Sequence, residues 1–138
     1  MEELSELPAF PFIVLAALLS GLFLFMNSRK NAYREASLSF RKAVEPTITE
    51  LKNGTGSTVK ILESAFNTHE EAVREFTKHL LWSRKAFQKH WHKYAFHSEA
   101  EIRFLEAYTS AGVSVSQAKV NRELAIQRLQ KLVSYARP

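Results

Sequence analysis

The feature that most constrains this chain is an apolar run near its N-terminus. From Leu7 to Ser28 the sequence contains no charged residue, and the run ends abruptly at Arg29 and Lys30. An α-helix of this length reaches roughly 33 Å at about 1.5 Å per residue, close to the thickness of the hydrocarbon layer of a bilayer. A chain of 138 residues could hardly bury such a segment on all sides of a soluble core. We therefore predict a transmembrane helix over residues 9–28.

The charges around the run predict that it is retained and indicate its orientation. A secretory signal peptide begins with positive charge and ends at a cleavage site of small residues, whereas this chain begins with the acidic stretch MEELSELP. All 19 Lys and Arg follow the run. The positive-inside tendency then places the N-terminus outside and the remainder of the chain in the cytoplasm. We expect a single-pass membrane protein that crosses the bilayer once.

Helical spacing continues beyond the run. An apolar stripe with spacings of three, four and seven is formed by Tyr33, Phe40, Val44, Ile48 and Leu51. Pro46 lies within this stripe, and we expect it to kink the helix or to start a second one, because proline lacks the N–H group. The stretch NGTGST that follows, with two glycines, predicts a loop in which Ser57 or Thr58 caps the next helix.

Several further helices are expected. Thr68 and Glu71 have the spacing of a capping box, so a new helix should start near Thr68, and Ser83 could cap another. A short helix is predicted around residues 102–108, and a last helix from about Ser116 to Ala136. Strand signals are confined to the short alternation GVSVS.

These patterns predict an all-α fold in which a single transmembrane helix is followed by a small cytoplasmic helical bundle. The expected organisation is an acidic extracytoplasmic N-terminus over 1–8, the transmembrane helix over 9–28, a juxtamembrane helix with a proline kink or break over 29–52, and the bundle over 58–138.

The composition argues against catalysis. The chain contains no Asp and no Cys, which removes Ser-His-Asp and Cys-His arrangements, and it has no G-x-S-x-G, GxGxxG, GxxxxGK[ST] or HExxH pattern. The five histidines lack the spacings that place metal ligands on one helix face, so we expect polar surface histidines and no metal site. We therefore predict no enzymatic activity, no catalytic residues and no cofactor.

The densest feature is the basic and aromatic stretch over residues 74–97. Lys85, Lys89 and Lys93 repeat every four residues and form a ridge along one helix face. One interpretation is that the aromatic residues belong to the core and the lysines to its solvated reverse. The other is a site for a lipid headgroup or a nucleotide, and no module for specific nucleic-acid binding accompanies it. The residues predicted for that anion site are Arg84, Lys85, Lys89, Lys93 and Trp91.

Two features predict self-association. Ala17 and Gly21 form a small-xxx-small pair that lets two membrane helices approach closely. The last helix carries a wide apolar arc, which has surface left over after one small bundle packs. We therefore expect the lipid bilayer and a homo-oligomer as partners.

The stretches FRKAVEP and ILESAFNTHEEAVREF, with the later Trp and Tyr, resemble a pattern found in uncharacterised small bacterial helical proteins, some with an N-terminal membrane anchor. The resemblance covers roughly residues 36–95. It implies a bacterial origin, hence the inner membrane, and a helical fold, with no reaction or ligand. The architecture is also similar in outline to membrane effectors of antiphage defence.

Two functions are consistent with these expectations. The first is a non-enzymatic membrane-anchored protein that self-associates or docks a partner through its cytoplasmic domain. The alternative is a membrane effector gated by an anionic nucleotide bound at the basic segment.

Overall fold

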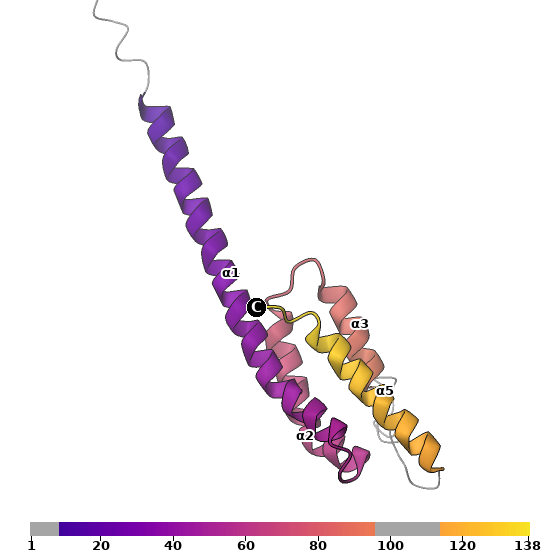
Figure 1. Cartoon of the computed structure of the whole chain (residues 1–138). Coiled ribbons are helices and arrows are strands. Elements are labelled where there is room, and N and C mark those ends of the chain that lie inside the picture. Colours follow the sequence, from indigo (N-terminus) through magenta and orange to yellow (C-terminus); the bar gives the residue numbers. More distant parts are fainter. Residues whose placement is uncertain (1–8, 96–113) are drawn as a thin grey trace, which may run out of the picture. The chain divides into compact units, whose positions relative to one another are not determined.

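The computed structural model describes residues 9–95 and 114–138, and within them every regular element is a helix (Figure 1). The elements are α1 (Ala9–Lys52), α2 (Thr58–Thr77), α3 (Arg84–Ala95) and α5 (Val115–Val133). The all-α prediction is confirmed for this part of the chain. The chain divides into two units, Met1–Ala32 and Tyr33–Pro138.

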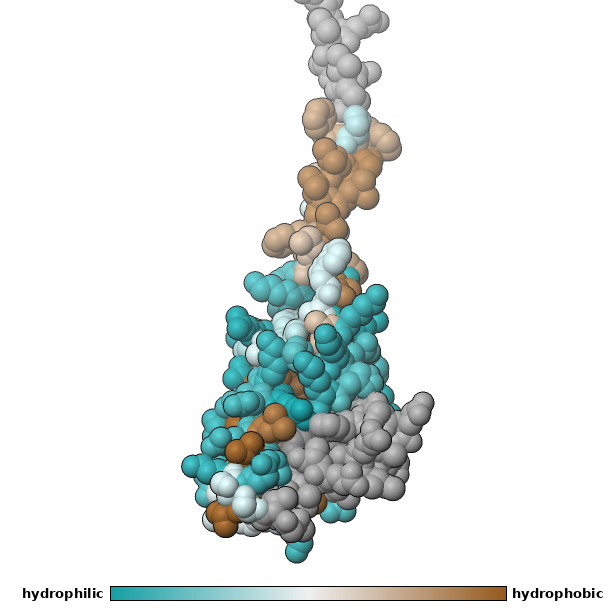
Figure 2. Space-filling view, turned by 90° about the vertical axis from the view of Figure 1, so that its right-hand side faces the viewer, coloured by the Kyte–Doolittle hydropathy of each residue, from teal (hydrophilic) through white to brown (hydrophobic). Residues whose placement is uncertain are grey.

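The first unit carries the apolar run as the N-terminal part of α1. Every residue from 9 to 31 is exposed, including ten large Phe, Leu, Ile, Val and Met side chains at positions 13–26 and two phenylalanines before them. In Figure 2 this segment is predominantly brown, whereas the described residues of the second unit on the face shown are mostly teal. The helix is long and apolar enough to cross a membrane.

A kink or a break was expected at Pro46; the helix continues through this residue, so the break does not occur. The buried residues Val44 and Ile48 lie on either side of the proline, whose own position is exposed. Burial of both flanking side chains in one core offsets the hydrogen bond that proline cannot make. The backbone carbonyl of Glu45 also accepts a 3.1 Å hydrogen bond from the Thr49 hydroxyl.

The helix start predicted near Thr68 was wrong, because α2 runs without interruption from Thr58 to Thr77. Ile61, Leu62, Val73 and Phe76 are buried and keep a helical spacing through the predicted start. The capping-box spacing is a local signal, and here the continuous apolar face prevails over it.

The later elements agree better with expectation. A turn follows Thr77, and α3 begins directly after Ser83, where a new cap was predicted. The last helix begins at Val115 with Ser114 as its N-cap, and it ends at Val133. The helix predicted around 102–108 lies outside the described residues.

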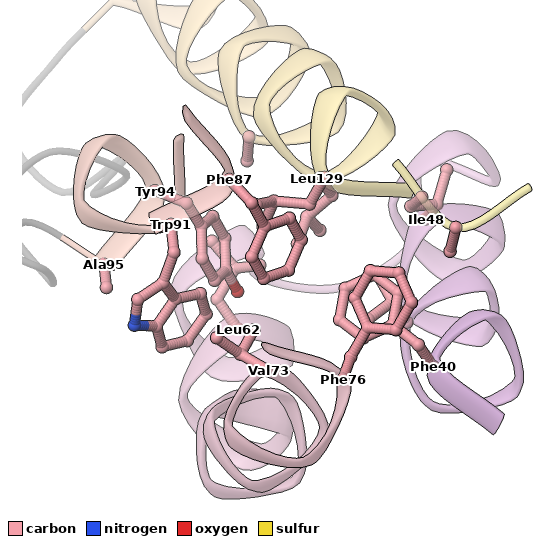
Figure 3. Packing of buried hydrophobic residues seen from close by; sticks show 14 of the residues in the cluster. Phe40, Ile48, Leu62, Val73, Phe76, Phe87, Trp91, Tyr94, Ala95 and Leu129 are labelled. Atoms are coloured by element: carbon pink, nitrogen blue, oxygen red, sulfur yellow. The ribbon is translucent and has the colours of Figure 1, made fainter. Parts of the chain in front are cut away.

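The core of the second unit is built on three phenylalanines from three helices (Figure 3). Phe40 of α1 stacks on Phe76 of α2 with ring centroids 4.9 Å apart. Phe87 of α3 meets both rings edge-on, at 5.6 Å and 5.3 Å. Such offset and edge-to-face pairs add to the burial of apolar area. Around them lie Val44, Ile48, Leu51, Ile61, Leu62, Val73, Leu80, Trp91, Tyr94, Ala95, Ala125, Leu129, Leu132 and Ala136.

The loop between α1 and α2 is held by a residue from the far end of the chain. Gly54 and Gly56 adopt φ angles of 71° and 78°, which glycine adopts without a steric penalty. Ser57 occupies the N-cap position of α2 without a side-chain capping bond. The guanidinium of Arg122 donates instead to Thr58 Oγ1 (3.0 Å), to the Leu51 carbonyl (3.2 Å) and to the Gly56 carbonyl. One cation therefore fastens the loop to α5.

Candidate functional site

The basic ridge of α3 lies on the surface, as its spacing predicts. Lys85, Lys89 and Lys93 are exposed, as is Arg84, and the side chains facing the core are Phe87, Trp91, Tyr94 and Ala95. The helix is therefore amphipathic, with aromatics on one side and cations on the other.

Trp91 does not share the surface of the predicted anion site. Its side chain is 6 % exposed and stacks on Phe66 with ring centroids 5.8 Å apart. The ring also lies 5.5 Å from that of Tyr94. The ring thus contributes to the core and does not stack on an anion at the surface. The spacing in the sequence already indicates that Trp91 and the lysine ridge face different ways. Lys89 and Lys93 each lie two positions from Trp91, and residues two apart do not share a helix face.

A shallow groove between α3 and α5 brings together cations that lie far apart in the sequence. It has a volume of about 370 Å³ and is lined by His90, Lys93, Gln127, Arg128 and Lys131. Partial burial lowers the pKa of His90, and Lys131, Lys93 and Lys89 lower it further by repulsion. Among the residues that the structure describes, the lining contains no acidic side chain, so its electrostatic potential suits a small anion. Of the predicted site residues, only Lys93 lies in this groove.

His69 is buried, contrary to the expectation of surface histidines. The residue is 1 % exposed, and its ring nitrogens lie 3.0 Å from Thr47 Oγ1 and 3.1 Å from the Tyr94 hydroxyl. These bonds connect α1, α2 and α3. Burial lowers the pKa of His69 to about 4, so the ring is neutral near pH 7 and one nitrogen donates while the other accepts.

The other histidines fit the expectation or lie outside the described residues. His79 and His92 are exposed and His90 is half-buried, whereas His97 is outside the described part. In that part, no group of three His, Cys, Asp or Glu side chains is placed to hold a metal ion. His69 could have been recognised from its position, because it falls on the apolar stripe of α2, three residues after Phe66 and four before Val73.

The turn between α2 and α3 exposes two large apolar side chains. Trp82 is 97 % exposed and Leu81 is 59 % exposed, whereas Leu80 beside them is buried in the core. In the sequence, Trp82 is only one of several aromatic residues within the basic stretch over residues 74–97. The turn that ends α2 removes this side chain from any packed helix face.

The small residues of the apolar helix lie on open surface. Ala17 and Gly21 are exposed, and a Cβ added at Gly21 would have no atom within 4 Å. A second helix could approach closely at this face. The role of the two residues in a helix contact stays a prediction.

Comparisons of the chain with protein families, curated proteins and solved structures find no match.

Proposed function

We propose that this chain is a single-pass membrane protein that acts by binding and not by catalysis, through a helical bundle that self-associates or docks a partner. The observation that supports the anchor is the burial pattern. The buried core consists entirely of residues from Ser37 onward, while every residue from 9 to 31 is exposed. Lipid is the environment that removes so much apolar surface from water at no cost to the bundle.

The proposed orientation places the bundle in the cytoplasm of a bacterial cell, with the N-terminus outside the inner membrane. It follows from the distribution of Lys and Arg, since all 19 lie after the apolar run. Alkaline phosphatase fused after Pro138 is therefore expected to show no periplasmic activity. Strong activity of this fusion would contradict the orientation. The matched control is a variant of the same fusion in which the positive charges lie before the apolar run, and it should gain periplasmic activity because its orientation is reversed. Its substitutions are Glu2→Lys, Glu3→Lys, Glu6→Lys, Arg29→Gln, Lys30→Gln and Arg34→Gln.

Self-association is proposed to involve the small-residue face of the apolar helix. The apolar arc of the last helix should contribute less to self-association than expected, because its residues Ala125, Leu129 and Leu132 are already buried within the bundle. The membrane helix has no such partner among the described residues, so its surface is available to a second copy.

The absence of cysteine in the chain permits a direct test of this contact. Ala17→Cys in native membranes is expected to form a disulfide-linked dimer on mild oxidation. Leu19→Cys, two positions away and about 200° around the helix, is the matched control and should form much less. Adding Gly21→Leu to Ala17→Cys should lower the dimer yield several-fold. Equal yields at positions 17 and 19, or no dimer at either, would contradict the proposed face.

The second candidate function is an effector gated by a phosphate-bearing ligand, and the groove between α3 and α5 favours it. Lys93, Arg128 and Lys131 line this groove, and none of its lining residues in the described part of the chain is acidic. The same cysteine assay discriminates the two functions. ATP or inorganic phosphate should change the yield of the Ala17→Cys dimer if the membrane helices respond to the groove. An unchanged yield, with no binding of either anion to the full chain, would exclude this candidate.

A further inference from the structure

We propose that the turn between α2 and α3 is a second membrane contact, in which Leu81 and Trp82 enter the headgroup region of an anionic bilayer and Arg84 and Lys85 pair with lipid phosphates. The contact would hold the bundle against the membrane surface. This inference rests on the proposed function, because it requires the apolar helix to place the chain at a bilayer.

The turn presents its apolar side chains outward in an ordered way. Leu80 is 3 % exposed and anchors the turn in the core. The backbone N–H groups of residues 78, 79 and 80 donate to carbonyls of residues 75, 76 and 77 at 3.3, 2.9 and 3.2 Å. Leu81 and Trp82 then extend beyond the last anchored residue, at 59 % and 97 % exposure. Tryptophan is enriched at membrane interfaces because its ring combines a large apolar area with one polar N–H.

The turn lies at the end of the bundle to which the apolar run is covalently attached. Tyr33 contacts Phe76 of the last turn of α2, with ring centroids 5.9 Å apart. Its hydroxyl also donates to the Tyr135 carbonyl at 2.6 Å. Tyr33 follows Ser28, the end of the uncharged run, by only five residues. Even a fully extended chain of that length spans no more than about 18 Å, so a membrane-embedded run keeps this end of the bundle near the surface.

The charge of this end is complementary to anionic lipid. In segments 33–36, 74–85 and 131–138 two exposed residues are acidic, Glu35 and Glu75, against seven exposed Lys and Arg: Arg34, Arg74, Lys78, Arg84, Lys85, Lys131 and Arg137. One of these cations is partly neutralised, since Lys78 pairs with Glu75 at 2.8 Å. At the opposite end, segments 48–63 and 114–123 are nearly balanced, with Lys52, Lys60, Lys119 and Arg122 against Glu50, Glu63 and Glu123.

The lysines of the ridge should therefore contribute unequally to lipid binding. Lys85 is in the first turn of α3, next to the exposed pair, whereas Lys93 lies eight residues further along the helix. That separation is about 12 Å along the axis, which exceeds the screening length of about 8 Å at physiological salt. Lys85 should contribute to lipid binding, and Lys93 should contribute little.

The two tryptophans allow the contact to be observed in the full chain. Trp91→Phe leaves Trp82 as the single tryptophan, because the chain contains two. In vesicles of phosphatidylglycerol and phosphatidylcholine, its fluorescence is expected to be quenched by lipids brominated near the headgroup and protected from aqueous iodide. Lys85→Glu should shift the docked-to-free ratio by about tenfold or more, since each lysine at an anionic surface contributes roughly a factor of five. The matched control Lys93→Glu should leave it nearly unchanged.

A second variant covers the case in which Trp91→Phe disturbs the core. Trp82→Cys in the cysteine-free chain can carry a polarity-sensitive dye, with Asn67→Cys on the exposed face of α2 as its control. The dye at position 82 should report an apolar environment in anionic vesicles, and the dye at position 67 should report water.

The outcomes separate the contact from the anchor. If alkaline carbonate extracts the full chain from membranes, the anchor fails and with it the proposed function. If the chain resists extraction but Trp82 or its dye remains fully accessible to water, the anchor stands and the second contact is overturned. Equal effects of Lys85→Glu and Lys93→Glu would also overturn it, because they would assign lipid binding to the whole ridge.

Discussion

Lowering the pH from 7 to 4 is expected to lower the free energy of unfolding of the bundle by roughly 3 kcal/mol through His69 alone. Burial holds the pKa of His69 at about 4 in the folded protein, against 6.5 for an exposed histidine. Between these values the unfolded chain binds the proton and the folded chain does not. Stability therefore falls as the pH drops below 6.5, and this contribution levels off near pH 4.

The loss comes from burying charge and not from broken hydrogen bonds. A protonated ring would donate from both nitrogens, and the hydroxyls of Thr47 and Tyr94 can each accept. What the imidazolium lacks is water, because the side chain is enclosed by three helices. The bonds can persist on protonation while the ring is still penalised.

Thermal unfolding of the full chain in mild detergent, followed by near-UV circular dichroism, measures this dependence. His69→Leu should lower the free energy of unfolding at pH 7.5, because it removes the hydrogen bonds that the ring makes with the Thr47 and Tyr94 hydroxyls. It should also flatten the pH profile of stability between pH 6.5 and 5. His79→Gln, at an exposed position, is the control and should retain the wild-type slope. An unchanged slope in His69→Leu would show that other groups cause any acid sensitivity.

The elements that could be predicted from the sequence are those specified by periodicity. Phe40, Val44, Ile48 and Leu51 are buried, as their stripe indicates, and Ser83 precedes a helix as expected. The errors arose where a local signal competed with a continuous apolar face. Thr68 has the spacing of a helix start but lies within α2, and of the kink or break expected at Pro46 the break is wrong, because α1 continues through this residue. In both cases tertiary burial decides.

The candidate sites were harder to predict, because they depend on where helices end and on contacts between distant segments. The exposure of the lysine ridge followed from its spacing. The roles of the tryptophans did not, because Trp91 enters the core and Trp82 leaves it only once a turn interrupts the helix after Thr77. The groove between α3 and α5 joins residues some 35 positions apart, such as Lys93 and Arg128, which one-helix patterns do not connect.

Arg122 is a further residue that no local pattern identified, since its acceptors lie 64 to 71 positions earlier in the chain. We expect Arg122→Met to lower the free energy of unfolding by about 2–4 kcal/mol, because hydrogen bonds to a charged group contribute about 1.5–3 kcal/mol each and these are partly exposed. Methionine keeps much of the apolar stem, so the change isolates the guanidinium.

The variant Arg122→Lys should recover only part of this loss, because a lysine ammonium cannot match the planar fork that reaches Thr58, Leu51 and Gly56 together. Lys119→Met is the matched control, since it removes an exposed cation one turn earlier on the same helix and should change stability by less than about 0.5 kcal/mol. Thermal unfolding of the full chain compares the three variants. If Arg122→Met is no less stable than Lys119→Met, the loop is held by its own backbone bonds and its two positive-φ glycines, and the link to α5 contributes nothing to the stability of the bundle.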